Sequence, residues 1–332
     1  MIGLLLLNRN SNKMKIRKIK KKAIAMPFNW IFALVAGGVI LFLSIYAAGK
    51  FIQTGQQTIS TETAARFISL FDPLETGLAA GKAQSITFRK KSKISFDCIE
   101  DYRFFGRQRL NFTEQTFGKK YGETGAEISI KDKYVFTGSI LEGKTFYLFS
   151  KPFFMPFKVI DQTFVLSDNY CFYDAPRYIE DELAGLKLGN VFFPNETETC
   201  QGINVCFEEG DLGCQIIVYE NQGYVSNRIY GERVYFVGDL IYGAIFSHPE
   251  IYECNVKRMK RRFDQLAEIY LDKIDIVKRA NCESNVGPKL RTVIGDIGNS
   301  RELAGLYNEI EEIRLINDAA SCKLYYNDRF GE

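Results

Sequence analysis

Histidine and tryptophan are almost missing from this 332-residue chain, which contains only His248 and Trp30. A Ser–His–Asp or Cys–His catalytic set could therefore use only His248, and a metal site with two histidines cannot form within one chain. Neither a GxGxxG nor a GxSxG motif occurs. These shortages exclude most histidine-dependent enzymes and leave catalysis by carboxylates as the enzymatic alternative.

Acidic residues are absent from the first 61 positions, which carry nine basic residues. The rest of the chain has 34 basic and 40 acidic residues and is therefore net acidic. A nucleic-acid-binding surface needs a basic footprint, so we expect no nucleic acid partner. Hydrophobic residues make up 46% of the chain and charged residues 25%, which excludes global disorder.

A long uncharged run occupies residues 28–49 and reads FNWIFALVAGGVILFLSIYAAG. As a helix, these 22 residues would measure about 33 Å, enough for a hydrocarbon core of about 30 Å. Trp30 and Tyr46 lie near its two ends, where amphipathic rings prefer the headgroup level. A cleaved signal peptide is the alternative, with small residues at 47–49, but its apolar region would be shorter. We expect a retained signal-anchor helix over 28–52.

Charge predicts the orientation of this anchor. Eight basic residues precede the span within residues 1–27, a cytoplasmic basic arm, and only Lys50 follows it before the first acid. Positive flanks stay inside, so we expect a single-pass cell-membrane protein with a cytoplasmic N-terminus and its C-terminal part outside. Translation starting at Met1 and at Met14 both remain open.

Small residues form a stripe along the expected membrane helix. They are spaced so that two helices could approach closely, which would allow a homo-oligomer through this helix; the alternative is that small residues are simply common in membrane spans. The stripe consists of Ala33, Gly37, Ser44 and Ala48.

All eight cysteines follow the span, and an even number on the outer side predicts up to four disulfides. If two C-terminal helices run antiparallel, Cys254 meets Cys322; Cys282–Cys322 is the rival pair if residues 288–297 form a separate short helix. No CxxC pair occurs, so we expect no metal and no cofactor. The disulfide candidates are Cys98, Cys171, Cys200, Cys206, Cys214, Cys254, Cys282 and Cys322. Asn111 and Asn195 begin sequons and are glycosylation candidates.

The pattern of the remaining chain predicts an α+β fold, with one N-terminal transmembrane helix and a mixed β-sheet ectodomain that ends in a helical hairpin. Residues 53–81 are expected to form a helical stalk and linker. A β-rich region follows over 82–160, with a β-hairpin about the basic turn 89–91. An α/β region over 161–250 and a C-terminal helical hairpin over 251–332 complete the chain.

Three local segments allow sharper predictions. Residues 176–186 have proline first and acids early, as in the first turn of a helix. Asp239 is placed to cap a short helix that ends at Phe246, and His248 follows in a turn where it caps or meets solvent. Residues 151–157, KPFFMPF, are expected to form a buried strand edge, with an exposed loop that touches lipid or a partner as the alternative.

Two segments support a resemblance: IAMPFNWIFALVAGGVILF at 24–42 and FSHPEIYECNVKRMKRR at 246–262. They resemble uncharacterised archaeal single-pass membrane proteins with a cysteine-bearing outer domain. The resemblance spans most of the chain, implies a membrane-anchored ectodomain and brings no activity. The basic arm and apolar helix also look like the start of a type IV pilin, but the stretch after Met26 lacks the glutamate that pilins carry five residues into the mature helix.

The sequence therefore favours a non-enzymatic, membrane-anchored envelope protein whose disulfide-linked ectodomain binds an envelope protein partner or joins a surface assembly. The alternatives are an extracytoplasmic carboxylate-dependent hydrolase and a pilin-like or secretion-system subunit. Two acids about 5–9.5 Å apart in a cleft would favour the hydrolase. The acids weighed for that role are Glu180, Asp181, Glu182, Glu208, Glu209 and Asp211.

Overall fold

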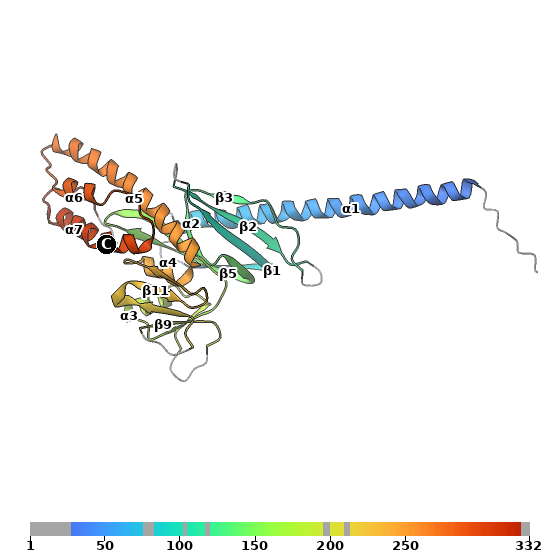
Figure 1. The fold of residues 1–332 in the computed structure, drawn as a ribbon, viewed down its shortest axis with the longest axis horizontal. Helices are drawn as coiled ribbons and strands as arrows, with labels where there is room; N and C mark the ends of the chain where they lie inside the picture. The colour runs from blue at the N-terminus through green and yellow to red at the C-terminus, as the bar shows by residue number, and fades with distance from the viewer. Residues whose placement is uncertain are drawn as a thin grey trace, which may run out of the picture. The chain divides into compact units, whose positions relative to one another are not determined.

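The structure is a computed structural model, and it describes residues 28–75, 83–101, 105–116, 120–194, 200–208 and 213–326. The expected basic arm, the two alternative starts, Asn195, Glu209 and Asp211 lie outside the described residues. The chain divides into two units, residues 1–52 and residues 53–332. As predicted, the fold is α+β, with one long apolar helix followed by mixed β-sheets and C-terminal helices (Figure 1).

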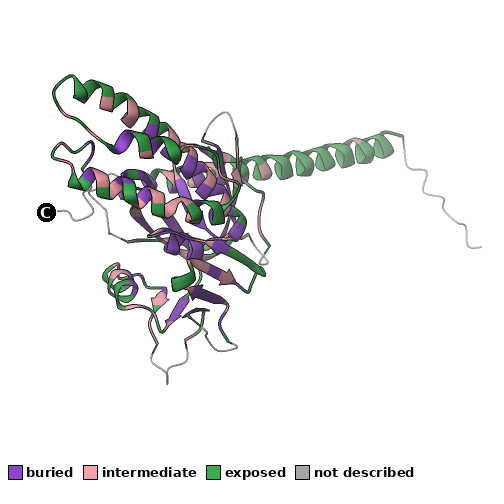
Figure 2. Ribbon diagram, turned by 60° about the vertical axis from the view of Figure 1, so that its left-hand side comes forward, coloured by how far each residue is buried: buried purple, intermediate pink, exposed green. Residues whose placement is uncertain are grey.

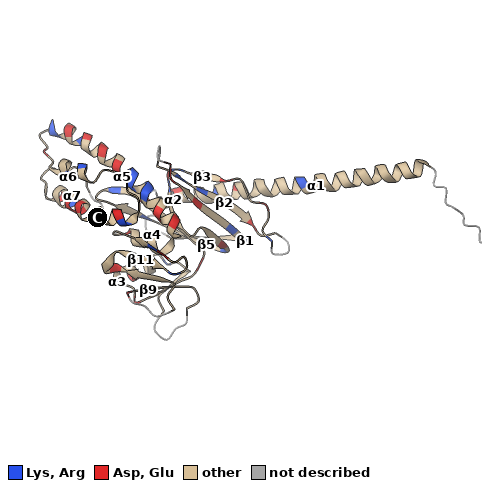
Figure 3. Ribbon diagram, viewed as in Figure 1, with Lys and Arg blue, Asp and Glu red and all other residues tan. Residues whose placement is uncertain are grey.

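Helix α1 (Phe28–Ser69) contains the apolar run. Its apolar side chains are exposed over residues 28–52, as Figure 2 shows, and Figure 3 shows almost no charge there. Among the described residues, this is the one helix long and apolar enough to cross a membrane. The four residues of the small stripe are exposed, and a Cβ added to Gly37 would meet no atom within 4 Å. Self-association through this stripe stays a prediction.

In the second unit, the end of α1 and helix α2 (Phe71–Glu75) belong to the hydrophobic core. Ala64, Phe67 and Phe71 are almost fully buried and pack against strands of the first sheet. The Phe67 ring contacts Phe146 edge to face, with centroids 6.3 Å apart. The helical segment expected after residue 53 is present, and its last turns form part of the core.

The first sheet has six strands in the order β3-β2-β1-β5-β6-β4. Its neighbouring strands are antiparallel, except that β4 runs parallel to β6. The strands are β1 (Gln84–Ile99), β2 (Arg107–Glu114), β3 (Ile128–Ile130), β4 (Tyr134–Thr137), β5 (Ile140–Phe154) and β6 (Lys158–Leu166).

The hairpin predicted about residues 89–91 is wrong. Strand β1 runs unbroken through this segment, and its register with β5 shifts between Thr87 and Ser92. Such a bulge keeps the alternation of apolar and polar residues on both sides, which is why the sequence pattern resembles a hairpin. Phe88 in the bulge faces inward and contacts the Phe112 ring at 5.2 Å.

The second sheet also has six strands, in the order β12-β11-β10-β9-β7-β8. β7 runs parallel to both β8 and β9, and β9 runs parallel to β10. Helix α3 (Arg177–Gly185) connects β7 to β8 and confirms the helix predicted over 176–186. The strands are β7 (Tyr170–Tyr173), β8 (Val191–Phe192), β9 (Ile203–Phe207), β10 (Ile216–Tyr219), β11 (Tyr224–Asn227) and β12 (Glu232–Tyr235).

One large apolar cluster joins the two sheets to the helices that follow them. Phe153, Met155 and Phe157 belong to it with at most 2% of each residue exposed, so this part of segment 151–157 is buried as expected, whereas Lys151, Pro152 and Phe154 are half-buried. The helices are α4 (Leu240–Phe246), α5 (Pro249–Lys278), α6 (Val286–Thr292) and α7 (Ser300–Ala319). α4 is the short helix predicted to end at Phe246, and α5 and α7 form the predicted C-terminal helical hairpin, with α6 between them.

All eight cysteines are paired, but the favoured pair Cys254–Cys322 is wrong. Cys254 bonds Cys98 and thereby ties α5 to β1, because α5 begins against the first sheet. Cys322 bonds Cys282, the rival pair, because the short helix α6 separates the two arms of the hairpin. The disulfides are Cys98–Cys254, Cys171–Cys200, Cys206–Cys214 and Cys282–Cys322.

Candidate functional site

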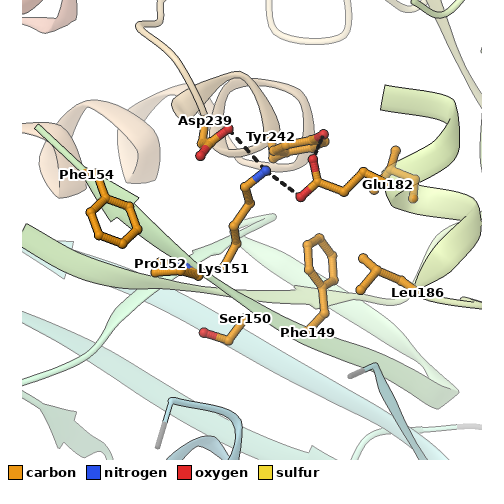
Figure 4. A pocket seen from close by; sticks show the side chains of 10 residues that line it. Phe149, Ser150, Lys151, Pro152, Phe154, Glu182, Leu186, Asp239 and Tyr242 are labelled. Atoms are coloured by element: carbon orange, nitrogen blue, oxygen red, sulfur yellow. Dashed lines mark hydrogen bonds and ion pairs between the residues drawn. The ribbon is translucent and has the colours of Figure 1, made fainter. Parts of the chain in front are cut away.

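A cavity of about 420 Å³ lies where β5, α3 and α4 meet. Figure 4 shows that Lys151 rises from β5 across this cavity, toward Asp239 at the start of α4 and Glu182 on α3. A volume of this size is typical of small-ligand pockets, which combine apolar walls with a few polar groups. The apolar walls are Phe149, Pro152, Phe154, Leu183 and Leu186.

Lys151 holds the polar wall of the cavity together. Its ammonium forms ion pairs with the Glu182 Oε1 atom and, at 3.1 Å, with the Asp239 Oδ1 atom. It also lies 4.6 Å from the centroid of the Tyr242 ring, a cation–π contact. The Lys151 side chain is 18% exposed, whereas Glu182 and Asp239 are 38% and 44% exposed. The carboxylates are therefore more open to a ligand than the lysine is.

Local sequence explains this placement. Residues two apart on a strand share a face, so Phe149 and Lys151 both face the cavity. On α3, Ile179 and Leu183 are buried, and Glu182 lies at the margin of that buried face. Asp239 occupies the predicted position before α4, but its side chain makes no capping hydrogen bond and pairs with Lys151 instead.

Two tyrosines line or border the site, and burial, together with the negative charges of the site, raises the pKa values of both. The Tyr242 hydroxyl donates to the Glu182 Oε2 atom at 2.6 Å, and burial together with this contact raises the pKa of Tyr242. The Tyr178 hydroxyl donates to Glu220 at 2.8 Å. Burial, that bond and the nearby charges of Glu220, Asp239 and Glu182 raise the pKa of Tyr178. Three carboxylates thus act on Tyr178, and two of them also contact Lys151.

The spacing of the two cavity carboxylates bears on hydrolysis. Because Glu182 and Asp239 both contact one nitrogen, their contacting oxygens lie within about 6 Å of each other. Carboxylate pairs about 5–5.5 Å apart are used by retaining glycosidases. Lys151, however, stands between the two acids and occupies the space that a scissile bond would need.

Of the weighed acids that lie within the described residues, only Glu182 reaches this cavity. Glu180 and Asp181 are exposed on α3, where Asp181 pairs with Arg177 at 3.7 Å. Glu208 is exposed and accepts a hydrogen bond from Asn221 at 3.4 Å. Lys151 and Asp239 were not predicted as site residues, because nothing in the sequence indicates that β5 and the start of α4 both lie beside Glu182 of α3.

His248 is a helix cap, one of the two roles that the sequence offered for it. Its Nδ1 atom accepts a hydrogen bond from the Glu250 backbone N–H at 3.3 Å at the start of α5. Its ring lies 4.2 Å from the ring of Tyr230. Neither contact is that of a catalytic base with a nucleophile.

Asn111 is a half-buried residue of β2, paired opposite Ser95. The sequon threonine, Thr113, is only 7% exposed. A glycan at Asn111 would therefore have to be attached before β2 pairs with β1. Glycosylation of Asn111 and of Asn195 stays a prediction.

Residues 138–145 read GSILEGKT and have the spacing of a phosphate-binding P-loop. A working P-loop lies between a strand and a helix, with its backbone N–H groups turned toward the phosphates. Here Ile140–Thr145 form the first part of β5, and they pair with residues of β1. The match therefore makes no phosphate cradle.

Within the described ranges, no group of three or more His, Cys, Asp or Glu side chains is arranged to hold a metal ion. Comparisons of the chain with protein-family models, curated proteins and solved structures give no significant match. The function must therefore be argued from the helix, the disulfides and the cavity.

Proposed function

We propose that this protein is a single-pass, signal-anchored envelope protein. Its N-terminus is cytoplasmic, and residues from about 53 onward form an extracytoplasmic domain that binds a partner without catalysing a reaction. The observation that carries the proposal is the exposed apolar segment of α1, in a chain whose eight cysteines are all disulfide-bonded. Disulfides persist in oxidising compartments, and a charge-free span needs a bilayer.

Topology is tested with intact cells and right-side-out vesicles. Protease added outside should digest residues beyond the span and leave an N-terminal fragment protected, and non-reducing mass spectrometry should recover four disulfide-linked peptide pairs. Reduced cysteines in native membranes, or a protected C-terminal domain, would contradict the orientation.

The cavity supports a specific partner chemistry. Lys151 balances only one of the two carboxylates that it contacts, which leaves the cavity with an excess negative charge. Apolar walls with an excess of negative charge suit a ligand with an apolar stem and a positive head. A lysine or arginine side chain of a partner protein has this form.

Ligand titration on the full-length protein in nanodiscs tests this chemistry. Capped lysine amide should bind, whereas capped norleucine and capped glutamate amides should not. Glu182→Gln and Asp239→Asn should weaken binding of capped lysine about tenfold, the usual effect of losing one charge-assisted hydrogen bond. Lys151→Met should tighten it, because the resident ammonium no longer competes.

Glu180→Gln is the matched control, since Glu180 lies exposed on the same helix. It should leave the affinity unchanged. Equal binding of capped norleucine, or weaker binding by the Lys151→Met protein, would rule out a cation-binding cavity.

The carboxylate pair favours a second candidate, an extracytoplasmic hydrolase that uses Glu182 and Asp239. Purified protein would then release reducing ends from envelope glycans, and either Glu182→Gln or Asp239→Asn would abolish the release. Turnover that survives both substitutions would come from another source and leave the binding proposal standing.

The 42-residue helix α1 favours one form of partner binding, in which this protein is a subunit of a surface assembly. A pilin-like subunit would be cut just before Met26 or Pro27. Mass spectrometry of the N-terminal peptide distinguishes the two cases, because a chain that keeps its basic arm is an anchored protein and not a processed subunit.

A further inference from the structure

The first residues of the second unit, directly after the apolar segment, contact a loop and a strand bulge of the same unit. Gln53, the first residue of that unit, donates from its Nε2 atom to Glu123 at 2.5 Å. One and two turns later, Gln56 and Ser60 line a cavity of about 70 Å³ together with Lys90. The loop that contains Glu123 and the bulge of β1 therefore lie beside the start of this unit.

Chain length places these groups close to a bilayer surface. If residues 28–49 cross the hydrocarbon core, Gln53 follows its end by four residues, which span at most about 14 Å of chain. The headgroup region adds about 5–8 Å on each side of the hydrocarbon. Groups that touch Gln53 are thus at the headgroup level or within about one Debye length of it, about 8 Å at physiological salt.

The bulge of β1, the loop about Glu123 and the residues that contact them carry a local excess of positive charge, although residues 53–332 are net acidic. The acids among them are Glu114, Glu123 and Glu142. We name the five bases the basic cluster: Arg89, Lys90, Lys91, Lys93 and Lys120.

Most of these acids already have partners. Glu142 contacts Lys91 at 3.5 Å and Lys93 at 3.8 Å, and it accepts a hydrogen bond from the Tyr121 hydroxyl. Glu114 lies 3.8 Å from Lys90. Within the described ranges, Arg89 and Lys120 form no ion pair, and both are exposed. The cluster therefore keeps positive charge that faces solvent.

The bulge of β1 explains why these bases face outward together. The register shift frees residues 88–91 from the ladder with β5, so that Phe88 can enter the core. Arg89, Lys90 and Lys91 are then left on the surface. A regular strand would have placed alternate residues on opposite faces of the sheet.

We propose that the basic cluster binds anionic lipid headgroups of the leaflet from which residues 53–332 emerge. The proposal rests on the membrane anchor proposed above. Juxtamembrane lysine and arginine residues are drawn to an anionic surface, and the attraction fades within a Debye length. This contact orients the extracytoplasmic domain against the membrane and makes its position sensitive to lipid charge and salt.

Tryptophan quenching tests the proposal on the full-length protein in vesicles. Trp30, the one native tryptophan, reports the anchor through lipids brominated on their acyl chains. A Trp30→Phe/Tyr121→Trp protein reports the cluster through lipids with a nitroxide on the headgroup. With 30% phosphatidylglycerol, we expect quenching of the residue-121 tryptophan at least twice as strong as in pure phosphatidylcholine, and 0.5 M salt should remove the difference.

A charge-removing variant and a matched control complete the test. Arg89→Gln/Lys90→Gln/Lys120→Gln should abolish the dependence on phosphatidylglycerol. Arg177→Gln/Lys187→Gln/Arg291→Gln, which removes three exposed bases elsewhere, should keep it. Equal quenching in both lipids, or a dependence that survives loss of the cluster, overturns the lipid proposal if Trp30 is quenched normally. Failure of the acyl-chain lipids to quench Trp30 overturns the anchor itself.

Discussion

The two six-stranded sheets differ in how they are held together. The first sheet contains long strands, up to the 16 residues of β1, and its core is rich in phenylalanine rings in tilted and edge-to-face contact. The strands of the second sheet have two to five residues. Two disulfides attach to it, Cys171–Cys200 from β7 and Cys206–Cys214 from β9. Short strands bury little apolar area each, so covalent links replace part of the missing core contacts.

The largest effect is expected from the one disulfide of the first sheet. Cys98→Ala/Cys254→Ala opens a loop of 156 residues, for which chain entropy predicts a loss of about 5 kcal/mol. Cys206→Ala/Cys214→Ala opens a loop of 8 residues, with a predicted loss of about 2.5 kcal/mol. Denaturant unfolding of the full chain in detergent measures both losses.

Hydrogen exchange sharpens the same comparison. Loss of Cys206–Cys214 should raise exchange in β9 and β10 while β1 and β5 stay protected. Uniform loss of protection in both sheets would mean that the second sheet does not depend locally on its disulfides.

The next effect concerns the core of the first sheet. Phe67→Ala should destabilise the protein by about 3–5 kcal/mol, because Phe67 is 2% exposed and its removal leaves a cavity. Ile59→Ala, on the same helix but at a residue 58% exposed, should change stability by less than about 0.5 kcal/mol. Equal effects would show that the end of α1 is not part of this core.

A smaller effect is expected where α5 meets the first sheet. Arg258 is fully buried, and its guanidinium donates to the carbonyls of Phe105, Lys131 and Lys133 and to two side-chain oxygens. Burial lowers the pKa of Arg258 to about 10, so it stays charged at neutral pH. Arg258→Lys keeps the charge but loses the planar fork, and should cost about 2 kcal/mol in thermal or denaturant unfolding.

Lys289→Gln, which breaks an exposed ion pair, is the control. If Arg258→Lys lowers the unfolding free energy as little as Lys289→Gln does, other contacts hold α5 to this sheet.

The smallest effect is a pH dependence near the second sheet. Glu253 on α5 accepts hydrogen bonds from the backbone and hydroxyl of Ser300, and Ser300 in turn bonds Tyr235 of β12. Burial raises the pKa of Glu253 above its ordinary value. The folded state therefore holds this proton more tightly than the unfolded state does, and the resulting stabilisation falls as pH rises through the raised pKa.

Unfolding free energies of the native protein and of Glu253→Gln, measured from pH 4 to pH 7, should diverge in this way. The native protein should lose stability relative to the variant as pH rises. A constant difference would contradict the assigned pKa direction.

Several elements were predictable because their signals are local. The helix over 176–186, the buried apolar residues of segment 151–157 and the capping histidine all follow from neighbouring residues. The hairpin at 89–91 failed because a bulged strand and a hairpin share the same alternation. The pairing of Cys254 failed because spacing along a helix does not reveal which strand packs against it.

The candidate cavity was not predictable for the same reason. Lys151, Glu182 and Asp239 lie 31 and 57 positions apart in the chain, and their contact depends on how α3 and α4 pack against β5.

The amino-acid pattern alone sufficed for the apolar span, the asymmetry of charge around it and the expectation of disulfides, because these depend on composition along a continuous stretch. The disulfide partners, the acidic cavity and the basic cluster beside Gln53 arise from packing between segments far apart in the chain. Such contacts depend on complementary shapes and buried polar partners, which no linear spacing encodes.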